Sequence, residues 1–560
     1  MVSFARNHLF GLQLLNQRAK FVRINGLKNM RKIFAFCMGL AVAASLLNAQ
    51  TNNSGFRAVV EELPRPIYDQ HPEFVDLYYK AWELAYERID TLAGLPAPVY
   101  MDEAHMSSRI WIWDTCLMAH FCKYCPSIFP GIESLDNFYG VMLADQTAPL
   151  PQVLGNIWCG KNYGKMVPFK IHHADNPPLF AWTEYVYALQ TGDRSRLEKV
   201  YVENKYLQRW YDLFESFDPA APRPYGSSQK VALKKFDDGY AWNGCSSGMD
   251  NTPRGRTSTG SSRADCPDNP DLRWVDALSF QGLSALYMGK IAELIGLSAE
   301  AKVWNERHQV MTEKLNSLYW DETDSFYYDI FSDGSKCKVK TIGSWWPLLA
   351  QMAPLERQDK MIAHLRNPNE FGGFVATPSL SRSDADFIAD GGYWRGSVWL
   401  PTTYMALKTV DLSGEYDLAR EIAAQLLNHM WRTYEDYEPH TIWECYSPTE
   451  YLPARNKKAE IVRNDFCGWS ALGPISIFLE DLIGIKEANA FTNTLVCDFE
   501  KRPKGRVGVE NYRFGDVVCS IVATKSYVRV ASNLPFTLVV DGKERKVKIG
   551  VNKYKRQAQR

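Results

Sequence analysis

Residues 241–255 read AWNGCSSGMDNTPRG, a loop-forming sequence with one carboxylate, one guanidinium and an aromatic side chain. Its glycines free the backbone, and Pro253 prevents a helix from running through it. This composition is typical of a catalytic loop that presents Asp250 to a pocket, with Arg254 and Trp242 placed to contact a substrate. It is also compatible with an ordinary surface loop, because Asn-Thr-Pro and Ser-Ser-Gly are common in turns.

On both sides of this loop the sequence is mainly helical. From Pro72 onward, apolar residues recur every three or four positions, which predicts about a dozen amphipathic helices. The clearest stripes cover 74–89, 197–214 after Asp193 as N-cap, 280–294 before Gly296, and 419–430. No glycine-rich phosphate loop follows a strand, which disfavours a doubly wound nucleotide-binding fold. No fixed period supports a superhelical repeat array. We therefore predict a helical toroid, in which inner helices ring a central pocket.

The sequence changes character near residue 486. Runs of β-branched residues cover 517–522, 527–530 and 536–540, and Asp541-Gly542 then predicts a hairpin turn into 545–549. We expect a helical domain over residues 50–485 and a small antiparallel β-sandwich over 486–560.

The composition of the chain limits the classes of partner that it is expected to bind. The 560 residues carry 64 basic and 64 acidic side chains, and this balance does not favour binding to nucleic acid or to a membrane surface. Aromatic residues reach 13%, with 17 Trp and 29 Tyr. Core packing accounts for most of them, but flat rings also stack on the C–H faces of sugars. A carbohydrate partner is thus one interpretation of the aromatic excess, and core packing is the other.

The N-terminus predicts export. Met30-Arg31-Lys32 is a basic start, residues 33–47 are apolar, and Ala49 suits cleavage before Gln50. The apolar run is too short for an ordinary membrane span. Residues 1–29 are then an upstream extension that precedes the signal peptide. We expect the mature protein to lack residues 1–49 and to be exported to the periplasm or the extracellular space. The alternative is a buried N-terminal helix.

Cysteine and histidine usage indicates no structural zinc, and we assign no metal ligand and no cofactor, while metal dependence stays open. Of the 12 cysteines, Cys37 lies in the predicted signal, and the 11 that remain imply at least one free thiol. Cys122 and Cys125 have no second pair nearby, so we interpret them as packing residues. His172-His173 could contact sugar hydroxyls, but adjacent histidines rarely chelate one ion, so we place them at a pocket rim or in a structural role.

Four loops combine charged and aromatic residues in a way that helical packing does not require. They are the segment 109–114, the Asp250 loop, the segment 391–399 and the Trp443-Glu444 pair. The candidate pocket residues are Arg109, Trp113, Asp114, Trp242, Asp250, Arg254, Tyr393, Trp394, Arg395, Trp443 and Glu444. Any one loop could hold a buried ion pair, but four in one helical domain favour a shared sugar pocket. Trp394 is then a stacking platform whose removal weakens binding and leaves the thermal midpoint nearly unchanged.

Two isolated carboxyl groups among aromatic rings fit glycoside hydrolysis. This reaction needs a protonated carboxyl that releases the leaving oxygen and a carboxylate that serves water or attacks the sugar directly. Apolar surroundings raise the pKa of a carboxyl group and keep it protonated near neutral pH. The spacing of Asp250 and Glu444 in the sequence does not give their separation, so retention and inversion both stay open on the residues alone.

Several motifs resemble those of glycoside hydrolase family 63 and of the related trehalases. They are SGMDNTPR at 247–254, YWRG at 393–396, WExYxP at 443–448 and DFCGWS at 465–470. The resemblance implies an (α/α)6 barrel and an inverting, exo-acting hydrolase of α-linked sugars, most often α-glucosides or related oligosaccharides. It also implies Asp250 as general acid and Glu444 as general base. Trp113, Asp114, Trp394 and Arg395 would line the subsite for the cleaved sugar.

Two other functions compete with this interpretation. A polysaccharide lyase on a similar toroid would use a Tyr or His base, and His172-His173 keeps that alternative open. A sugar-binding protein without catalysis is the other, but the presence of both carboxylates argues against it. Cys445 and Cys467 differ from the residues usual beside these motifs, which affects the expected substrate more than the chemistry.

Overall fold

The computed structural model describes residues 54–92, 95–104, 109–139, 157–158, 176–216, 233–256, 262–265, 267, 269–500 and 503–556. The chain divides into two compact units, Met1–Glu61 and Glu62–Arg560. The predicted signal segment 1–49 and His172-His173 lie outside the described residues. Among the helices that are described, none has the length and apolar content needed to cross a membrane.

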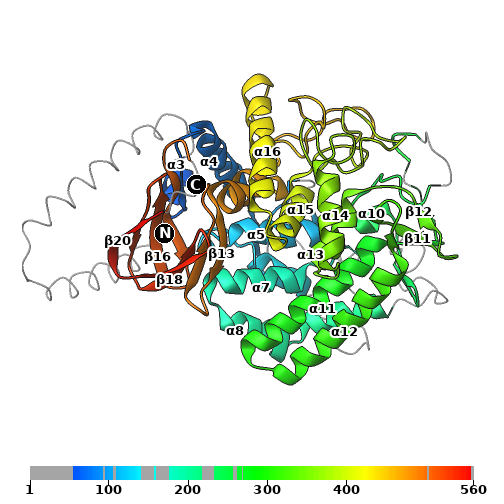
Figure 1. Cartoon of the computed structure of the whole chain (residues 1–560), viewed down its shortest axis with the longest axis horizontal. Coiled ribbons are helices and arrows are strands. Elements are labelled where there is room, and N and C mark those ends of the chain that lie inside the picture. Colours follow the sequence, from blue (N-terminus) through cyan, green and yellow to red (C-terminus); the bar gives the residue numbers. More distant parts are fainter. Residues whose placement is uncertain are drawn as a thin grey trace, which may run out of the picture. The chain divides into compact units, whose positions relative to one another are not determined.

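Helices make up most of the regular secondary structure of the second unit (Figure 1). The first unit contains α3 (Ser54–Val60). The helical segments that follow are α4 (Pro72–Tyr86), α5 (Ile112–Cys122), η1 (Glu133–Leu135), α7 (Phe180–Thr191), α8 (Arg194–Leu197), η3 (Glu198–Glu203), α9 (Tyr206–Glu215), α10 (Gly244–Ser247), α11 (Val275–Ile295), α12 (Ser298–Leu318), η4 (Ile342–Trp345), α13 (Trp346–Leu349), α14 (Leu355–Arg366), α15 (Leu400–Leu412), α16 (Tyr416–Asp436), η5 (Trp469–Leu472) and η6 (Gly473–Ile483).

The helices follow the apolar stripes of the sequence with one difference. Gly296 ends α11 in the left-handed region at φ 90°, and Asp193 caps α8 by accepting a hydrogen bond of 3.0 Å from Arg196 N. The stripe over 197–214, however, does not form one helix. Lys205 has a φ of 52°, so the backbone turns between η3 and α9 while the apolar face continues to the core.

The strands form two larger sheets and several two- or three-stranded ones. The strands are β1 (Arg65–Tyr68), β2 (Ile89–Thr91), β3 (Val99–Met101), β4 (Arg109–Ile110), β5 (Ile157–Trp158), β6 (Lys234–Phe236), β7 (Gly239–Ala241), β8 (Leu272–Arg273), β9 (Trp320–Asp321), β10 (Phe326–Tyr327), β11 (Asp329–Phe331), β12 (Lys336–Cys337), β13 (Ile485–Asn489), β14 (Thr494–Cys497), β15 (Val507–Phe514), β16 (Val517–Ala523), β17 (Tyr527–Ser532), β18 (Phe536–Val540), β19 (Lys543–Val547) and β20 (Gly550–Lys555).

The two larger sheets correct the prediction of a purely antiparallel domain. One sheet has the order β1-β15-β16-β17-β20 and the other β13-β14-β18-β19, in which β14 and β18 run parallel. β1 comes from outside residues 486–560 and pairs with the edge of β15. Side chains along β16 alternate between buried and half-buried, and the rings of Phe514 and Phe536 lie 5.5 Å apart across the two sheets. The sheets therefore pack face to face.

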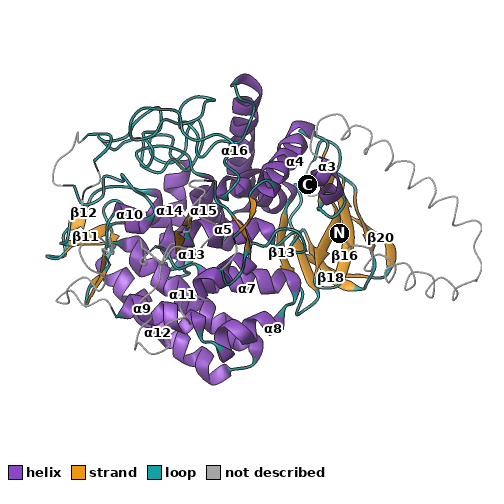
Figure 2. Ribbon diagram, turned by 180° about the vertical axis from the view of Figure 1, so that it is seen from behind, coloured by secondary structure: helices purple, strands orange, loops and turns teal. Residues whose placement is uncertain are grey.

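Long irregular segments collect at one end of the helices (Figure 2). Segments 367–399 and 437–468 contain no helix in the described residues and carry Tyr393 and Glu444. Helix α5 begins beside Trp111, its N-cap, and η5 begins at Trp469. The N-terminal ends of these helical segments therefore meet the loops that carry the candidate residues.

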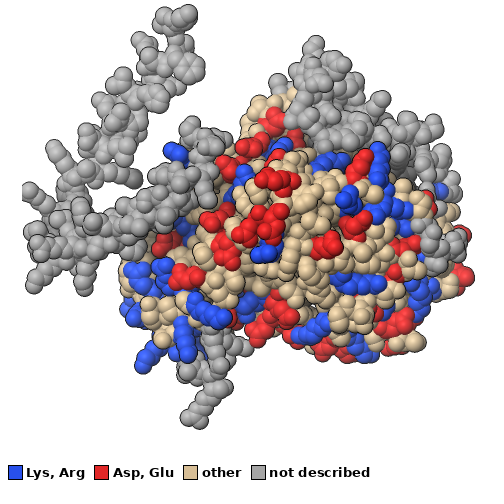
Figure 3. All heavy atoms as spheres, turned by 90° about the horizontal axis from the view of Figure 1, so that it is seen from above, with Lys and Arg blue, Asp and Glu red and all other residues tan. Residues whose placement is uncertain are grey.

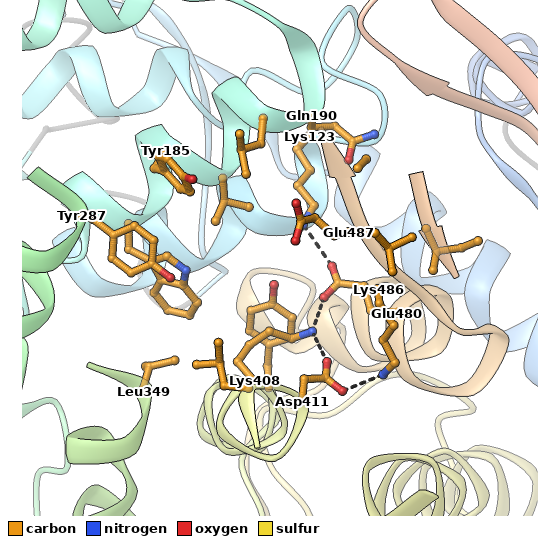
Figure 4. Close-up of a pocket in the computed structure, with 18 of the residues that line it drawn as sticks. Lys123, Tyr185, Gln190, Tyr287, Leu349, Lys408, Asp411, Glu480, Lys486 and Glu487 are labelled. Carbon is orange, nitrogen blue, oxygen red and sulfur yellow. Dashed lines mark hydrogen bonds and ion pairs between the residues drawn. The ribbon is translucent and has the colours of Figure 1, made fainter. Parts of the chain in front are cut away.

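A cavity of about 320 Å³ lies toward the C-terminal ends of the helices, beside β13 (Figure 4). Lys123 Nζ lies 3.0 Å from Glu480 Oε1, and Lys408 Nζ lies 2.7 Å from Glu480 Oε2. Asp411 accepts hydrogen bonds from Lys408 at 3.0 Å and from Lys486 at 2.7 Å. Cations at helix C-termini are favoured by the helix dipole, and this paired network connects α5, α15 and η6 to β13.

Lys and Arg side chains are interspersed with Asp and Glu on the face shown in Figure 3. Neither sign of charge dominates that face, which agrees with the equal numbers of basic and acidic residues in the chain.

Candidate active site

Two adjoining cavities share the candidate carboxylates. The inner cavity, of about 130 Å³, is walled mainly by Trp111, Trp113, Asp114, Trp394, Phe466 and Trp469. The outer cavity, of about 500 Å³, is lined by residues 456–463. Asp250, Tyr393 and Glu444 line both cavities. The carboxylates therefore lie where an aromatic chamber meets a polar one.

The Asp250 loop is fixed by its own short helix and by a ring packed against it. Asn243 caps α10 by accepting a hydrogen bond of 2.9 Å from Ser246 N. Gly248 ends α10 at φ 80°, and a Cβ atom at this position would lie 2.2 Å from Trp113 Cε3. Only glycine allows this close approach without displacing the ring. The contact holds the backbone just before Asp250 against Trp113.

Asn251 connects the Asp250 loop to the loop that carries Tyr393. Its side-chain amide donates to Gly392 O at 2.9 Å, and its side-chain oxygen accepts from Trp394 N at 2.9 Å. Its backbone oxygen accepts from Arg395 Nε at 3.0 Å. Asn251 is fully buried, so these bonds fix the two loops relative to each other.

Glu444 is buried and held by several donors. Its carboxylate accepts hydrogen bonds from Arg463 Nη1 at 2.7 Å and from Tyr393 Oη at 3.1 Å. Burial raises the pKa of Glu444 above its usual value, and the Arg463 guanidinium opposes that rise. A carboxylate in this setting can take a proton from a bound water.

Asp114 lies in the first turn of α5 and faces the inner cavity. Burial, together with the nearby charges of Glu444 and Asp250, raises its pKa to about 7. Asp114 is therefore partly protonated at neutral pH and can either donate a hydrogen bond to a sugar hydroxyl or accept one from it.

Asp250 is more exposed than Glu444, with 35% of its side chain accessible against 3%. Its Oδ2 lies 2.8 Å from Lys457 Nζ. Asp250 thus reaches the edge of the outer cavity, where a leaving group would lie.

The wall of the inner cavity is a cluster of indole rings. Trp394 stacks on Trp399 with ring centroids 4.1 Å apart, and its other neighbour Trp113 lies at 6.1 Å. Trp469 meets Trp113 edge to face at 5.4 Å. Such rings provide the apolar surface on which sugar rings stack.

Two predicted contact residues lie in the core instead of the pocket. Trp242 is 1% exposed, and its ring packs 6.3 Å from those of Trp274 and Phe280. Arg254 is also 1% exposed. It forms ion pairs with Asp276 and Asp329 and stacks over Trp274 at 4.1 Å. Tertiary partners therefore hold both side chains in the core, and neither lines the inner or the outer cavity.

Arg395 and Trp443 are buried beside residues of the site. Arg395 is 1% exposed and donates to Asp265 O at 2.9 Å as well as to Asn251 O. Trp443 is 4% exposed and packs edge to face on Tyr437. Neither lines the inner cavity, contrary to the prediction. The side chain of Arg109 lies outside the described residues.

Sequence reasoning missed the two cations that contact the carboxylates. Lys457 and Arg463 belong to the run RNKKAEIVR at 455–463, which has the composition of a solvated hairpin. Trp469 could have been predicted from the sequence, because it lies in the motif at 465–470 that resembles the family.

Comparison with known proteins agrees with this geometry. Residues 170–458 match the sequence profile of the mannosylglycerate hydrolase MGH1-like glycoside hydrolase domain. An uncharacterized protein of Borreliella burgdorferi is 25% identical over 430 residues, which are 75% of this chain and 81% of that protein. A mannosyl-oligosaccharide glucosidase of Saccharomyces cerevisiae is 28% identical over 247 residues, which are 40% of this chain and 27% of that enzyme.

A solved structure supports the fold. The GH63 mannosylglycerate hydrolase from Thermus thermophilus in complex with glucose has a TM-score of 0.52 at 18% identity, covering 71% of this chain and 99% of that one. The fold is thus a helical toroid, followed here by the C-terminal sheets.

The toroid, its aromatic cavity and its paired carboxylates define a glycosidase that hydrolyses glycosidic bonds. More narrowly, the chain belongs to the MGH1-like glycoside hydrolases of glycoside hydrolase family 63. This membership argues against the two alternatives, a polysaccharide lyase and a sugar-binding protein without catalysis.

Proposed function

We propose that this glycosidase is an exported, inverting, exo-acting enzyme that hydrolyses α-linked sugars. Asp250 is its general acid and Glu444 its general base. The observation that carries the proposal is that these two carboxylates line both cavities, with an aromatic chamber on one side and a polar chamber on the other. One terminal sugar fills the smaller inner cavity, and the leaving group occupies the larger outer one.

The proposed reaction is a single displacement. Asp250 protonates the glycosidic oxygen as the bond to the anomeric carbon breaks, and Glu444 removes a proton from the attacking water. Tyr393 and Arg463 orient the Glu444 carboxylate toward that water. Asp114 bonds a hydroxyl of the cleaved sugar while Trp113 and Trp394 supply the stacking surface.

The stereochemistry of the product tests inversion directly. An inverting enzyme admits water between carboxyl groups about 6.5–9.5 Å apart and releases the opposite anomer. NMR of the first product formed from an α-glycoside should show the β anomer. Early appearance of the α anomer would refute inversion.

α-Glucosides are the first substrate candidates, because mannosyl-oligosaccharide glucosidases are among the relatives. A screen of purified protein against α-linked glucose and mannose disaccharides and aryl glycosides tests the proposal. Release of one terminal sugar at a time is the expected result. Internal cleavage of a longer oligosaccharide would refute the exo mode.

A glycoside of a small carboxylic acid is a second candidate. Lys457, Lys458 and Arg463 place three cations along the outer cavity, where a leaving group with a carboxylate would lie. A related fold has been solved with Tris and D-glycerate bound. Mannosylglycerate and glucosylglycerate therefore belong in the same screen.

Two structural proposals complete the assignment. We assign α5, α7, α11, α13, α15 and η6 to the inner ring of an (α/α)6 barrel. We also propose that the segment 1–49 directs export and is removed, because it has the three-part layout of a signal peptide. N-terminal sequencing of secreted protein should start near Gln50, and an intact Met1 would refute cleavage.

A further inference from the structure

The hairpin at 455–461 places Lys457 beside Asp250, and Arg463, just after it, lies beside Glu444. Arg455 and Ile461 form its bridge, and Lys457 lies near its tip. Inside the hairpin, Asn456 N donates to Glu460 O at 2.8 Å. Its backbone is also anchored to the loop that carries Tyr393, because Tyr393 N donates to Arg455 O at 2.9 Å. The backbone is therefore fixed, and the mobile part of Lys457 is its four-carbon side chain.

The Lys457 ammonium contacts one oxygen of the Asp250 carboxylate, the proposed general acid. Lys457 Nζ lies 2.8 Å from Asp250 Oδ2 and 5.2 Å from the centroid of the Tyr393 ring. An ammonium group has three hydrogen-bond donors and no acceptor. While this pair is formed, Asp250 Oδ2 faces a group that can only donate, so that oxygen cannot present an O–H to a glycosidic oxygen.

The ion pair is accessible enough to be exchanged. About a third of each side chain is exposed, 33% of Lys457 and 35% of Asp250. Exposed pairs of this kind contribute little to stability. A hydrogen bond from an ammonium group to a ligand oxygen in a cavity that has lost its water is stronger. A leaving group with a suitable oxygen can therefore draw Lys457 away from Asp250.

We propose that Lys457 is a specificity-determining residue, which pairs with Asp250 in the empty site and moves to an acceptor oxygen of the leaving group when the outer cavity fills. The proposal rests on the roles assigned to Asp250 and Glu444 above. Once Lys457 has moved, Asp250 takes up a proton from the solvent and passes it to the glycosidic oxygen as the C–O bond breaks. Glu444 takes a proton from the attacking water, whose oxygen bonds to the anomeric carbon, and then returns that proton to the solvent, so both carboxylates regain their starting states.

This exchange selects a class of leaving group. Leaving groups with a hydroxyl or carboxylate next to the glycosidic oxygen, such as glycerol or glycerate, offer Lys457 a new partner. A methyl group offers none, so Lys457 stays on Asp250 for more of the time. A fluoride leaving group needs little protonation and is insensitive to the state of Asp250.

The test compares Lys457→Met, which keeps the apolar stem, with Lys525→Met. Lys525 is exposed in the turn between β16 and β17 and lines neither the inner nor the outer cavity, so its removal changes the net charge equally without touching the site. The substrates are the fluoride, methyl glycoside, glycosylglycerol and glycosylglycerate of the α-glucosyl and α-mannosyl series. Wild-type enzyme should favour the glycerol and glycerate glycosides over the methyl glycoside by about tenfold or more in kcat/KM.

Lys457→Met should abolish most of that preference and leave fluoride hydrolysis and the thermal midpoint within error. Lys525→Met should keep the preference within about threefold. Loss of the preference for glycerate alone would show that Lys457 recognises a carboxylate, and loss for both would show recognition of oxygen acceptors in general. An unchanged preference in Lys457→Met, or an equal loss on all substrates including the fluoride, would overturn the proposal.

The fluoride separates this inference from the proposed function. If Asp250→Asn hydrolyses the methyl glycoside as well as wild type does, the assigned acid is wrong, whatever Lys457 does. If Asp250→Asn is impaired on the methyl glycoside but active on the fluoride, the assigned acid stands, and the Lys457 variant then decides the inference alone.

Discussion

Arg463 Nη1 donates a hydrogen bond of 2.7 Å to Glu444 Oε1, and the backbone N–H of Arg463 reaches the other carboxylate oxygen at 3.4 Å. One residue thus contacts both oxygens of the buried carboxylate. Burial raises the pKa of Glu444 while the Arg463 charge opposes that rise. The guanidinium therefore sets the pH above which Glu444 is ionised and able to act as a base.

Replacing Arg463 with Met should move the acidic limb of the kcat/KM profile to higher pH. Without the guanidinium, only the Tyr393 hydroxyl and the backbone N–H of residue 463 oppose the effect of burial, so the pKa of Glu444 rises further and a higher pH is needed to ionise the base. The pH profiles of wild type, Arg463→Met and Arg463→Lys provide the measurement. The lysine variant should recover part of the shift, and a limb that stays in place in Arg463→Met would contradict this coupling.

Asp250→Asn and Glu444→Gln should respond differently to the leaving group. General acid and general base catalysis each contribute about 10²–10⁴-fold, so both variants should lose nearly all activity toward alkyl glycosides. A good leaving group needs less protonation, so an activated aryl glycoside should partly rescue Asp250→Asn and not Glu444→Gln. Circular dichroism confirms that both variants are folded. Equal rescue of the two variants would refute the assigned roles.

Asp114 should make the enzyme less stable as the pH rises. Its pKa is raised from 3.8 to about 7 in the folded protein. The folded state therefore binds more protons than the unfolded state between these values, and the contribution of Asp114 to the free energy of unfolding falls as the pH rises through this window. Asp114→Asn removes this dependence because the amide does not titrate.

Thermal midpoints of wild type and Asp114→Asn at about pH 4 and about pH 8 measure the effect. The variant should gain stability relative to wild type at the higher pH. A difference between the two proteins that does not change with pH would show that Asp114 is not protonated in the folded state.

Trp394→Ala should lower both stability and activity. The indole is 1% exposed and stacked on Trp399 at 4.1 Å, and removing a buried aromatic side chain costs about 3–5 kcal/mol. This outcome replaces the expectation, based on sequence, that the thermal midpoint would stay nearly unchanged. Trp394→Phe keeps a ring and should recover much of the stability. An Ala variant that loses activity but keeps its midpoint would show that the ring acts only on the substrate.

The elements of the fold that depend on neighbouring residues were predictable from the sequence. Three apolar stripes correspond to helices, namely 74–89 to α4, 280–294 to α11 and 419–430 to α16. They could be predicted because helical periodicity depends on residues three and four positions apart. The turn at Asp541-Gly542 was predictable for the same reason, since both residues readily adopt the positive φ angles seen there. The parallel pair β14–β18 was not, because it joins strands about forty residues apart.

The candidate site divides in the same way. Asp250, Glu444, Trp113 and Trp394 could be selected from local motifs, and the inner cavity brings them together. Which charged side chain reaches that cavity was decided only by the tertiary structure. Arg254 lies four residues after Asp250 yet is neutralised by Asp276 and Asp329 in the core.

Lys457 comes from a hairpin more than two hundred residues away from Asp250 and contacts its carboxylate. The sequence determined the helices, the two carboxylates and the class of chemistry, because each depends on residue type and short spacing. The tertiary structure decided the partners of the charged residues at the site, because their burial and ion pairing depend on segments that meet only in the folded chain.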